Sequence, residues 1–194
     1  MSTAYHYPSE LELVTYPHPA LRARNTAVTE FDDALATFCQ RLLDAMRSFR
    51  GVGLAAPQVA VNQRIFVSDH VGLEGEDAPS QPMIWINPSI EAPEGSTTYE
   101  EGCLSFPGIY AKVQRHDQFT AVWQDTSGTE HRRQLNASND ILGIVFQHEL
   151  DHLEGTLFVD HLTPSQLTMA RRRLRELEQT HKKRYGRPGS VLRR

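Results

Sequence analysis

The sequence has few cysteines, no long apolar run and no recognisable export signal. Its two cysteines, Cys39 and Cys103, are too few for a disulfide framework in 194 residues and are typical of a reducing compartment. No apolar run is long enough to cross a bilayer, so no membrane-spanning helix is expected. The first ten residues match neither the basic–apolar pattern of a secretory signal nor the arginine-rich pattern of an organelle signal. We therefore expect a cytoplasmic protein that does not act at a membrane.

Charge is divided unevenly along the chain. Residues 163–194 contain ten Lys/Arg and two Asp/Glu, a balance of +8, whereas residues 1–162 contain ten Lys/Arg and twenty-two Asp/Glu, a balance of −12. The acidic part argues against DNA or RNA lying across the body of the protein. The basic part leaves open a polyanionic partner for the C-terminal segment alone. The length fits one domain, with the C-terminal segment at its periphery.

Local patterns predict helices at both ends of the chain and strands in its middle. Apolar residues recur every three or four positions between Phe31 and Phe49, which predicts a helix with an N-cap near Thr29. Short β-branched and aromatic segments between turn residues predict five strands. They cover residues 64–68, 83–87, 97–100, 119–125 and 131–135.

Two further helices follow the strands. The second is expected over residues 138–153, ended by Gly155 in the left-handed conformation. The third is expected to begin at Thr163, with Pro164 in its first turn. The acidic segment 71–81 is expected to form an exposed loop. The order helix, strands, helix, helix is typical of the α+β class.

The second predicted helix contains the segment His148-Glu149-Leu150-Asp151-His152. Histidines four positions apart lie on one face of a helix and can bind one metal ion, with the glutamate between them acting on a bound water. His148 and His152 continue the apolar face of this helix, which disfavours a chance match on a solvated helix. The pattern therefore predicts a metal site in the interior.

A catalytic tetrahedral site needs a third protein ligand. In one class of HExxH enzymes it is a histidine six residues after the second, but Phe158 stands at that position. A second class uses a downstream glutamate; Asp160 is the wrong acid, and Glu176 and Glu178 lie among arginines. Cys103 is the remaining soft ligand for Fe²⁺ or Zn²⁺, although a buried free thiol explains it equally well.

A third segment, residues 51–58, reads Gly-Val-Gly-Leu-Ala-Ala-Pro-Gln. Its small residues let the backbone approach a ligand closely, and Gln58 supplies a side-chain amide. The segment lacks the lysine of a phosphate-binding loop, and no strand precedes it as in a dinucleotide fingerprint. A plain connection between a helix and a strand explains the same pattern.

Taken together, these segments resemble the peptide deformylase family. Residues 51–58, 101–105 and 147–155 match its three signature motifs in order and separation, and residues 16–21 resemble its opening segment. The resemblance covers about residues 13–160. It implies a metal-dependent hydrolase that removes the N-terminal formyl group from formyl-methionine of newly synthesised polypeptides and releases formate.

The same resemblance implies a fold. Residues 1–162 would form a small single α+β catalytic domain, in which curved antiparallel sheets surround a central metal-binding helix. Residues 163–194 would add a C-terminal basic helix and tail at the periphery of the same domain.

By matching positions, the resemblance also implies roles for individual residues. Cys103, His148 and His152 would bind the metal, and Glu149 would be the general base. The family uses Fe²⁺ in the cell, often replaced by Zn²⁺, Ni²⁺ or Co²⁺ in purified protein. The Leu104 N–H and the Gln58 side chain would stabilise the oxyanion, and Glu101 or Arg115 would orient the ligands.

Two segments would hold the peptide in an extended conformation, with the methionine side chain in an apolar pocket. The residues expected to contact substrate are Val52, Gly53, Leu54, Gly108, Ile109, Tyr110, Ile144 and Val145.

The chain departs from the family pattern at two of these places. Arg50 precedes the first motif where small or acidic residues are common, and Tyr110 stands where many relatives have arginine. Two other functions stay open on the residues alone. One is a zinc peptidase whose third ligand is Glu176 or Glu178, and the other is a binding protein with a structural metal.

The expected partners are nascent formylated polypeptides, and the basic tail has a candidate partner in the ribosome. Some relatives are thought to dock there through a C-terminal helix, and arginines and lysines would contact phosphates of ribosomal RNA. A solvated helix face explains the charges equally well. The residues concerned are Arg171, Arg172, Arg173, Arg175, Lys182, Lys183 and Arg184.

Overall fold

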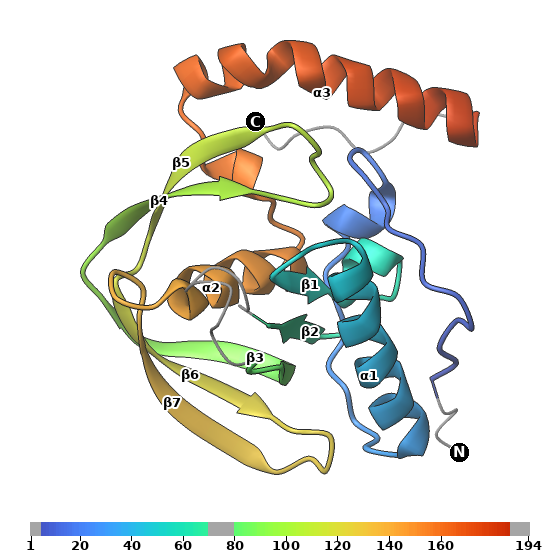
Figure 1. Cartoon of the computed structure of the whole chain (residues 1–194), viewed down its shortest axis with the longest axis vertical. Helices are drawn as coiled ribbons and strands as arrows, with labels where there is room; N and C mark the ends of the chain where they lie inside the picture. Colours follow the sequence, from blue (N-terminus) through green and yellow to red (C-terminus); the bar gives the residue numbers. More distant parts are fainter. Residues whose placement is uncertain (1–4, 70–79, 187–194) are drawn as a thin grey trace.

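A computed structural model of the chain describes residues 5–69 and 80–186. It contains three α-helices and seven strands within those ranges, joined by short 3₁₀ turns (Figure 1). The helices are α1 (Asp33–Ser48), α2 (Ile141–Leu153) and α3 (Pro164–Tyr185). The strands are β1 (Gly53–Ala55), β2 (Ile65–Ser68), β3 (Met83–Glu94), β4 (Thr97–Gly102), β5 (Tyr110–Arg115), β6 (Gln118–Gln124) and β7 (Glu130–Asn136).

The strands form two antiparallel sheets around α2. One sheet has five strands in the order β1-β2-β3-β6-β7, and the other is the β4–β5 hairpin. Figure 1 shows α2 between the two sheets, α1 packed beside β1 and β2, and α3 across the far side of the hairpin. The predicted α+β class, with a central helix between antiparallel sheets and a C-terminal helix, is therefore confirmed.

Helix α2 is buried on nearly every side: its first six residues, 141–146, are all apolar, and most of the polar residues that follow are buried as well. Phe146 is fully buried among aromatic residues of the large sheet, with its ring centroid 5.3 Å from that of Phe66 and 5.1 Å from that of Trp85. The helix begins after Asp140, whose side chain accepts a hydrogen bond from Leu142 N–H. This cap lies one or two residues beyond the predicted start.

Other predicted boundaries shift for similar physical reasons. Helix α1 starts after Asp32 rather than near Thr29, because the Asp32 carboxylate accepts the Leu35 N–H at 2.8 Å. Thr163 is the N-cap of α3, as predicted. Gly155 has φ +67°, and a side chain there would lie 2.7 Å from the Arg22 carbonyl oxygen, so the predicted left-handed ending of α2 is also confirmed.

All five predicted strands exist, and two more were not predicted. Strand β3 continues beyond residue 87 to Glu94, because bulges at Asn87 (φ +50°) and Ala92 (φ +45°) bend the strand without ending it. Strands β1 and β5 are the additional ones; β1 has only three residues and lies inside the glycine-rich segment. The loop expected at 71–81 falls almost entirely outside the described residues.

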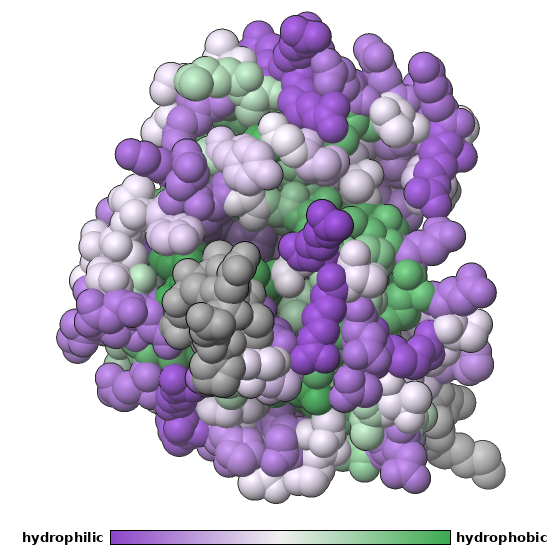
Figure 2. Space-filling model, viewed as in Figure 1, coloured by the Kyte–Doolittle hydropathy of each residue, from purple (hydrophilic) through white to green (hydrophobic). Residues whose placement is uncertain are grey.

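Helix α3 is attached along a narrow face. Leu174 and Leu177 are buried against the opening segment of the chain and the β5 side of the molecule, whereas most of its charged side chains are exposed. In Figure 2 the surface over α3 is correspondingly hydrophilic. None of the helices in the described part of the chain is both long enough and apolar enough to cross a membrane.

Candidate metal centre and active site

Three side chains from two separate parts of the chain meet at the inner face of α2. His148 and His152 lie one turn apart on the helix, and Cys103 follows directly after β4. One donor atom from each lies within 4.8 Å of the others, and Cys103 Sγ is 3.3 Å from His152 Nε2. The structure thus brings together the three residues predicted as metal ligands.

The donor set and its surroundings fit a divalent metal ion. A thiolate and two imidazoles are the ligands that Fe²⁺ and Zn²⁺ accept in proteins. Burial alone would lower the pKa of His148, but hydrogen bonds with Cys103 and Glu101 raise it well above its usual value; these groups favour a positive charge on or beside the imidazole, and a bound metal ion would take the place of the proton. Burial and the neighbouring His148 lower the pKa of His152 to about 3, which keeps that imidazole neutral, as a ligand must be.

A buried ionic network orients His148. Its Nδ1 lies 2.8 Å from Glu101 Oε2, and Arg115 donates to both oxygens of Glu101, at 2.7 and 2.9 Å. Burial opposes ionisation, yet the hydrogen bonds from Arg115 and His148 lower the pKa of Glu101 to about 2. Arg115 also donates to Asp151 at 2.6 Å, and Asp151 lies 2.8 Å from His161 Nε2.

From the sequence, either Glu101 or Arg115 was expected to orient the ligands, and in the structure both take part, one behind the other. Glu101 contacts the imidazole directly, and Arg115 holds Glu101. Asp151 and His161 were not predicted as parts of this network. Asp151 lies within the HExxH segment, but nothing in the sequence indicates that His161 reaches it.

Glu149 lies beside the three donors and is 4% exposed. Its Oε2 accepts no hydrogen bond from the described residues, and burial raises the pKa of the carboxyl to about 7. A Cβ on Gly53 would lie 2.5 Å from Glu149 Oε1, so β1 approaches the carboxylate as closely as only glycine permits. This close contact explains why the first motif has a glycine at position 53. The Glu149 carboxyl itself, with a pKa near neutrality, is suited to proton transfer near neutral pH.

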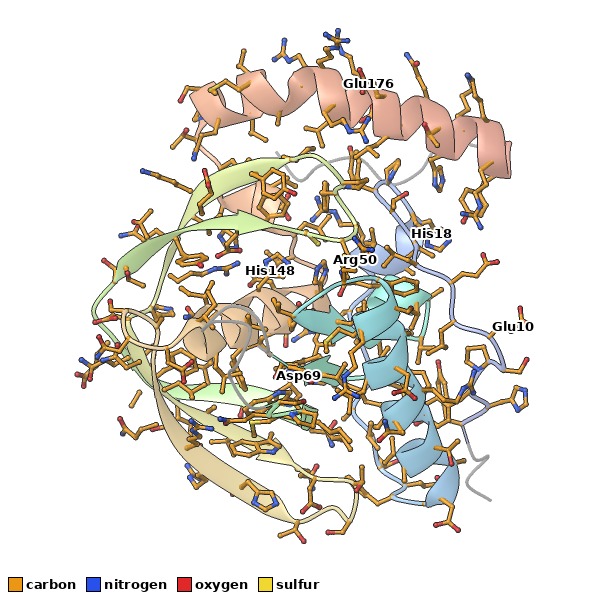
Figure 3. All side chains as sticks on the ribbon, in the orientation of Figure 1. Glu10, His18, Arg50, Asp69, His148 and Glu176 are labelled. Carbon is orange, nitrogen blue, oxygen red and sulfur yellow. The ribbon has the colours of Figure 1, made fainter. Side chains whose placement is uncertain are left out.

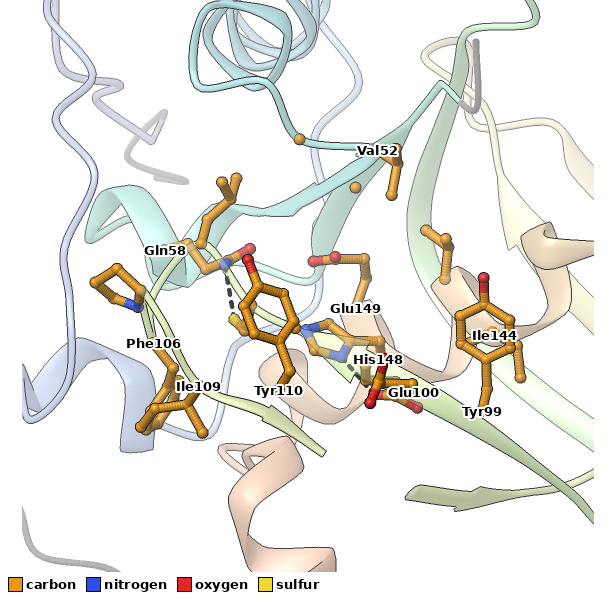
Figure 4. A pocket seen from close by; sticks show the side chains of 18 of the residues that line it. Val52, Gln58, Tyr99, Glu100, Phe106, Ile109, Tyr110, Ile144, His148 and Glu149 are labelled. Carbon is orange, nitrogen blue, oxygen red and sulfur yellow. Dashed lines mark hydrogen bonds and ion pairs between the residues drawn. The ribbon is translucent and has the colours of Figure 1, made fainter. Parts of the chain in front are cut away.

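Gln58 and Leu104 are the two residues expected to donate hydrogen bonds to the substrate oxygen, and both line the cavity beside Cys103. Gln58 Oε1 accepts the Ala55 N–H at 2.8 Å, which turns its Nε2 towards Cys103 Sγ, 3.6 Å away (Figure 4). Ser105 Oγ accepts from the same Nε2 at 3.3 Å. The Leu104 N–H donates no hydrogen bond to another described residue. The Gln58 amide therefore lies beside Cys103, and the Leu104 N–H, on the residue that follows Cys103, is not used by another described residue.

A cavity of about 510 Å³ opens beside these residues. Its apolar lining includes Val52, Ile144 and Val145, as predicted, and the buried side chains of Glu149 and His148 also line it (Figure 4). Leu54 does not line it, because its side chain is fully buried in the α1 core and only its backbone belongs to β1. The cavity is also lined by residues that the sequence did not single out as substrate contacts: Arg50, Tyr99, Glu100, Phe106, Pro107 and Ile141.

The alternative third ligands do not reach the centre. Phe158 packs against His148, with ring centroids 6.0 Å apart, and Asp160 forms an ion pair with Arg22. Glu176 pairs with arginines of α3, away from His148 in Figure 3, and Glu178 accepts the Tyr16 hydroxyl at 2.9 Å. Among the residues that the structure describes, only the group that includes Cys103 has the geometry of a metal site.

The model of the polypeptide deformylase family matches residues 10–168. The chain belongs to this family. A peptide deformylase of Zymomonas mobilis is 42% identical over 156 residues, which cover 79% of this chain and 86% of that protein. The chloroplast peptide deformylase 1B of rice is 39% identical over 177 residues, 91% of this chain but 64% of the rice protein.

Solved structures of deformylases share the fold over nearly the whole described chain. A plant deformylase, PDF1B, superposes with a TM-score of 0.87 at 34% identity and covers 95% of this chain and 98% of that one. The Plasmodium falciparum deformylase superposes with a TM-score of 0.82 at 39% identity, covering 90% and 99%. As a member of the peptide deformylase family, the chain is a metal-dependent hydrolase that removes the N-terminal formyl group from nascent polypeptides.

Proposed function

We propose that Cys103, His148 and His152 bind the metal ion of this deformylase and that Glu149 is its general base. The observation that carries the proposal is the convergence of three donor atoms within 4.8 Å, next to a buried carboxylate and beside a largely apolar cavity that Cys103 and His148 line. A divalent metal bound there would lower the pKa of a water ligand to about 7 and so supply a hydroxide nucleophile.

The protein residues have the following roles. Glu149 takes a proton from the attacking water and returns it to the leaving amine, a role for which its pKa of about 7 is suited. Gln58 Nε2 and the Leu104 N–H donate to the oxygen on which negative charge develops. Removal of one such donor typically costs about 3 kcal/mol in the transition state.

Substrate binding follows from the free edge of β1. This strand lies at the edge of the five-stranded sheet, so its outer backbone groups can pair with an extended peptide. We propose that Val52, Gly53 and Leu54 pair with it on one side and that Gly108, Ile109 and Tyr110 contact it on the other. The methionine side chain then enters the cavity and packs against Ile144 and Val145 of α2.

Two substitutions test the assignment. Glu149→Ala should abolish formate release from formyl-Met-Ala-Ser while the metal content stays near one per chain, and unchanged turnover would contradict the role as base. Cys103→Ala should lose the metal, whereas the matched control Glu176→Gln should retain it. Loss of metal in the control instead would favour a peptidase-like site with a glutamate ligand.

We further propose Fe²⁺ as the metal in the cell, with Zn²⁺, Ni²⁺ or Co²⁺ as replacements in purified protein. The thiolate ligand supports this, because soft sulfur donors favour these ions. A thiolate beside Fe²⁺ is open to oxidation, so the iron-loaded enzyme should lose activity in air and the nickel-loaded enzyme should not. Full activity of the iron form after prolonged aeration would refute the assignment.

We also propose that the enzyme works in the cytoplasm and docks on the ribosome through the C-terminal segment, residues 163–194, at the edge of the catalytic domain 1–162. Arg172 and Arg173 pair with Glu176, and Arg184 pairs with Glu12. Four other cations of α3 are exposed and form no ion pair with a described residue: Arg171, Arg175, Lys182 and Lys183.

These four exposed cations are the ones to neutralise. Their replacement by glutamine should weaken co-sedimentation with ribosomes and reduce its dependence on salt. The control replaces Arg132 and Arg133 of β7, on the other side of the molecule. Co-sedimentation that the α3 variant leaves unchanged would mean that the helix charges are only solvated.

A further inference from the structure

Arg50 is held at the rim of the active-site cavity by an uncommon backbone conformation. It follows the end of α1 with φ +59°, a conformation that glycine usually supplies. The Arg50 N–H donates to the Arg47 carbonyl at 3.0 Å and the Gly51 N–H donates to the Met46 carbonyl at 2.9 Å, which fixes this turn. The turn therefore places a long cationic side chain where the helix ending itself favours glycine.

The guanidinium group of Arg50 has no ion-pair partner within residues 5–69 and 80–186. The side chain is exposed and lines the cavity, and no other lysine or arginine does so. Figure 3 shows it between α1 and the hairpin, near His148. An unpaired cation at the mouth of a cavity attracts anionic groups on a ligand that enters.

Three acidic residues also line the cavity: Glu101 is paired with Arg115 and Glu149 is buried, which leaves Glu100 as the exposed one. Glu100 lies on β4 and is exposed, but its partner in the β4–β5 register is Lys112. Residues directly opposite in an antiparallel pair have Cβ atoms about 5 Å apart, so Lys112 partly compensates Glu100. The rim therefore has a net positive side at Arg50, although residues 1–162 carry a balance of −12.

The distance from the reacting centre identifies which part of the substrate meets Arg50. Gly53 marks the centre, because its backbone touches Glu149, and Arg50 lies three residues before it. Three residues span at most about 10 Å, and the turn at Arg50 shortens this distance, so the Arg50 side chain is within reach of the second or third residue of an extended peptide whose formyl group lies at Gly53.

We propose that Arg50 gives this enzyme a preference for formyl-methionyl peptides with an acidic side chain at their second or third residue. The inference rests on the proposed function, in which the peptide lies extended beside β1. An exposed ion pair of this kind contributes modestly, so the expected preference is about 1.5- to 5-fold in kcat/KM. Salt should reduce it, because the pair is solvent-accessible.

The test compares C-terminally amidated peptides that differ only in the charge of one residue. The ratio of kcat/KM for formyl-Met-Ala-Asp-amide to that for formyl-Met-Ala-Asn-amide reports position three, and the formyl-Met-Asp-Ala and formyl-Met-Asn-Ala amides report position two. We expect at least one ratio above one in the wild type, falling towards one at 500 mM NaCl. Arg50→Gln should abolish the preference, Arg50→Glu should invert it and Arg50→Lys should keep it.

The matched control is Arg41→Gln, which removes the same charge from α1 at a residue that does not line the cavity. Its ratios should equal those of the wild type. Ratios of one in the wild type, or ratios that Arg50→Gln leaves unchanged, would overturn the inference while deformylation itself stands. Failure of every peptide to release formate would instead contradict the proposed function.

Discussion

Gly53 allows a sharp test of how closely β1 approaches the general base. A Cβ at this position would lie 2.5 Å from Oε1 and 2.9 Å from Cδ of Glu149, and 2.9 Å from Cγ1 of Val145. Nonbonded carbon contacts are optimal near 3.5 Å, so Gly53→Ala must displace the Glu149 carboxylate or the strand by roughly 1 Å.

A displacement of that size should affect catalysis more than folding. A misplacement of about 1 Å in a reacting group can lower the rate by about 10²-fold, which corresponds to about 2.7 kcal/mol of transition-state stabilisation. Overpacking of the core itself costs about 1–3 kcal/mol of folding free energy. The three atoms nearest to this Cβ position belong to Glu149 and Val145 rather than to a metal ligand, so we expect the metal content to stay the same.

The assay measures kcat for formate release, metal content and the midpoint of urea unfolding for each variant. Gly143→Ala is the matched control. Gly143 is on α2, the helix that carries Glu149, but a Cβ there would lie 2.8 Å from the Ala137 backbone and not against the Glu149 carboxylate. We expect the control to lose stability with little loss of kcat and Gly53→Ala to lose kcat about 10²-fold. Equal losses of kcat in both variants, or a fully active Gly53→Ala, would refute the reasoning.

Three further predictions concern charge and thiol chemistry. Glu101→Gln leaves Arg115 buried with a weaker partner, so it should lower the free energy of unfolding by about 3–5 kcal/mol. Because Glu101 also orients His148, the same variant should bind the metal about 10–100-fold more weakly. A variant as stable as wild type in urea would contradict this prediction. Although burial opposes it, hydrogen bonds from Arg47 and Ser80 lower the pKa of Asp69, so its ionised form stabilises the fold above the usual carboxyl pKa. The difference in unfolding free energy between wild type and Asp69→Asn should be largest above pH 5 and shrink as the pH falls below about 4, whereas a difference that grows in acid would have the wrong sign. Burial raises the pKa of Cys39 to about 12, so iodoacetamide should alkylate only Cys103 in the folded metal-free protein. Mass spectrometry measures the labelling of each thiol, and equal rates for the two cysteines would contradict this prediction.

Local chemistry in the sequence is enough to predict most of the regular structure. The apolar period of α1 and α2, the threonine cap of α3 and the glycine after α2 are local signals, and each agrees with the structure. Strand β1 was missed because three residues rich in glycine and alanine carry no strand signal of their own. Its pairing with β2 exists only once the chain has folded.

In the candidate site, too, local patterns predict some features and only the folded structure shows the others. The HExxH spacing predicts two ligands on one helix face by itself, but only the structure shows that Cys103, 45 residues before His148, meets them. The series from Glu101 through Arg115 and Asp151 to His161 joins β4, β5, α2 and the turn after it. No local pattern in the sequence specifies that contact, because it depends on how the hairpin packs on α2.

Release of free Met-Ala-Ser by the metal-loaded protein is the decisive measurement, because hydrolysis of a formyl or an acetyl peptide yields this same product together with formate or acetate. The substrate is formyl-Met-Ala-Ser, and acetyl-Met-Ala-Ser is the control that differs by one methyl group at the scissile amide. The close approach of Gly53 to Glu149 leaves little room beside the base, so we expect rapid hydrolysis of the formyl peptide and none of the acetyl peptide. Hydrolysis of both peptides at similar rates, or of neither, would contradict it.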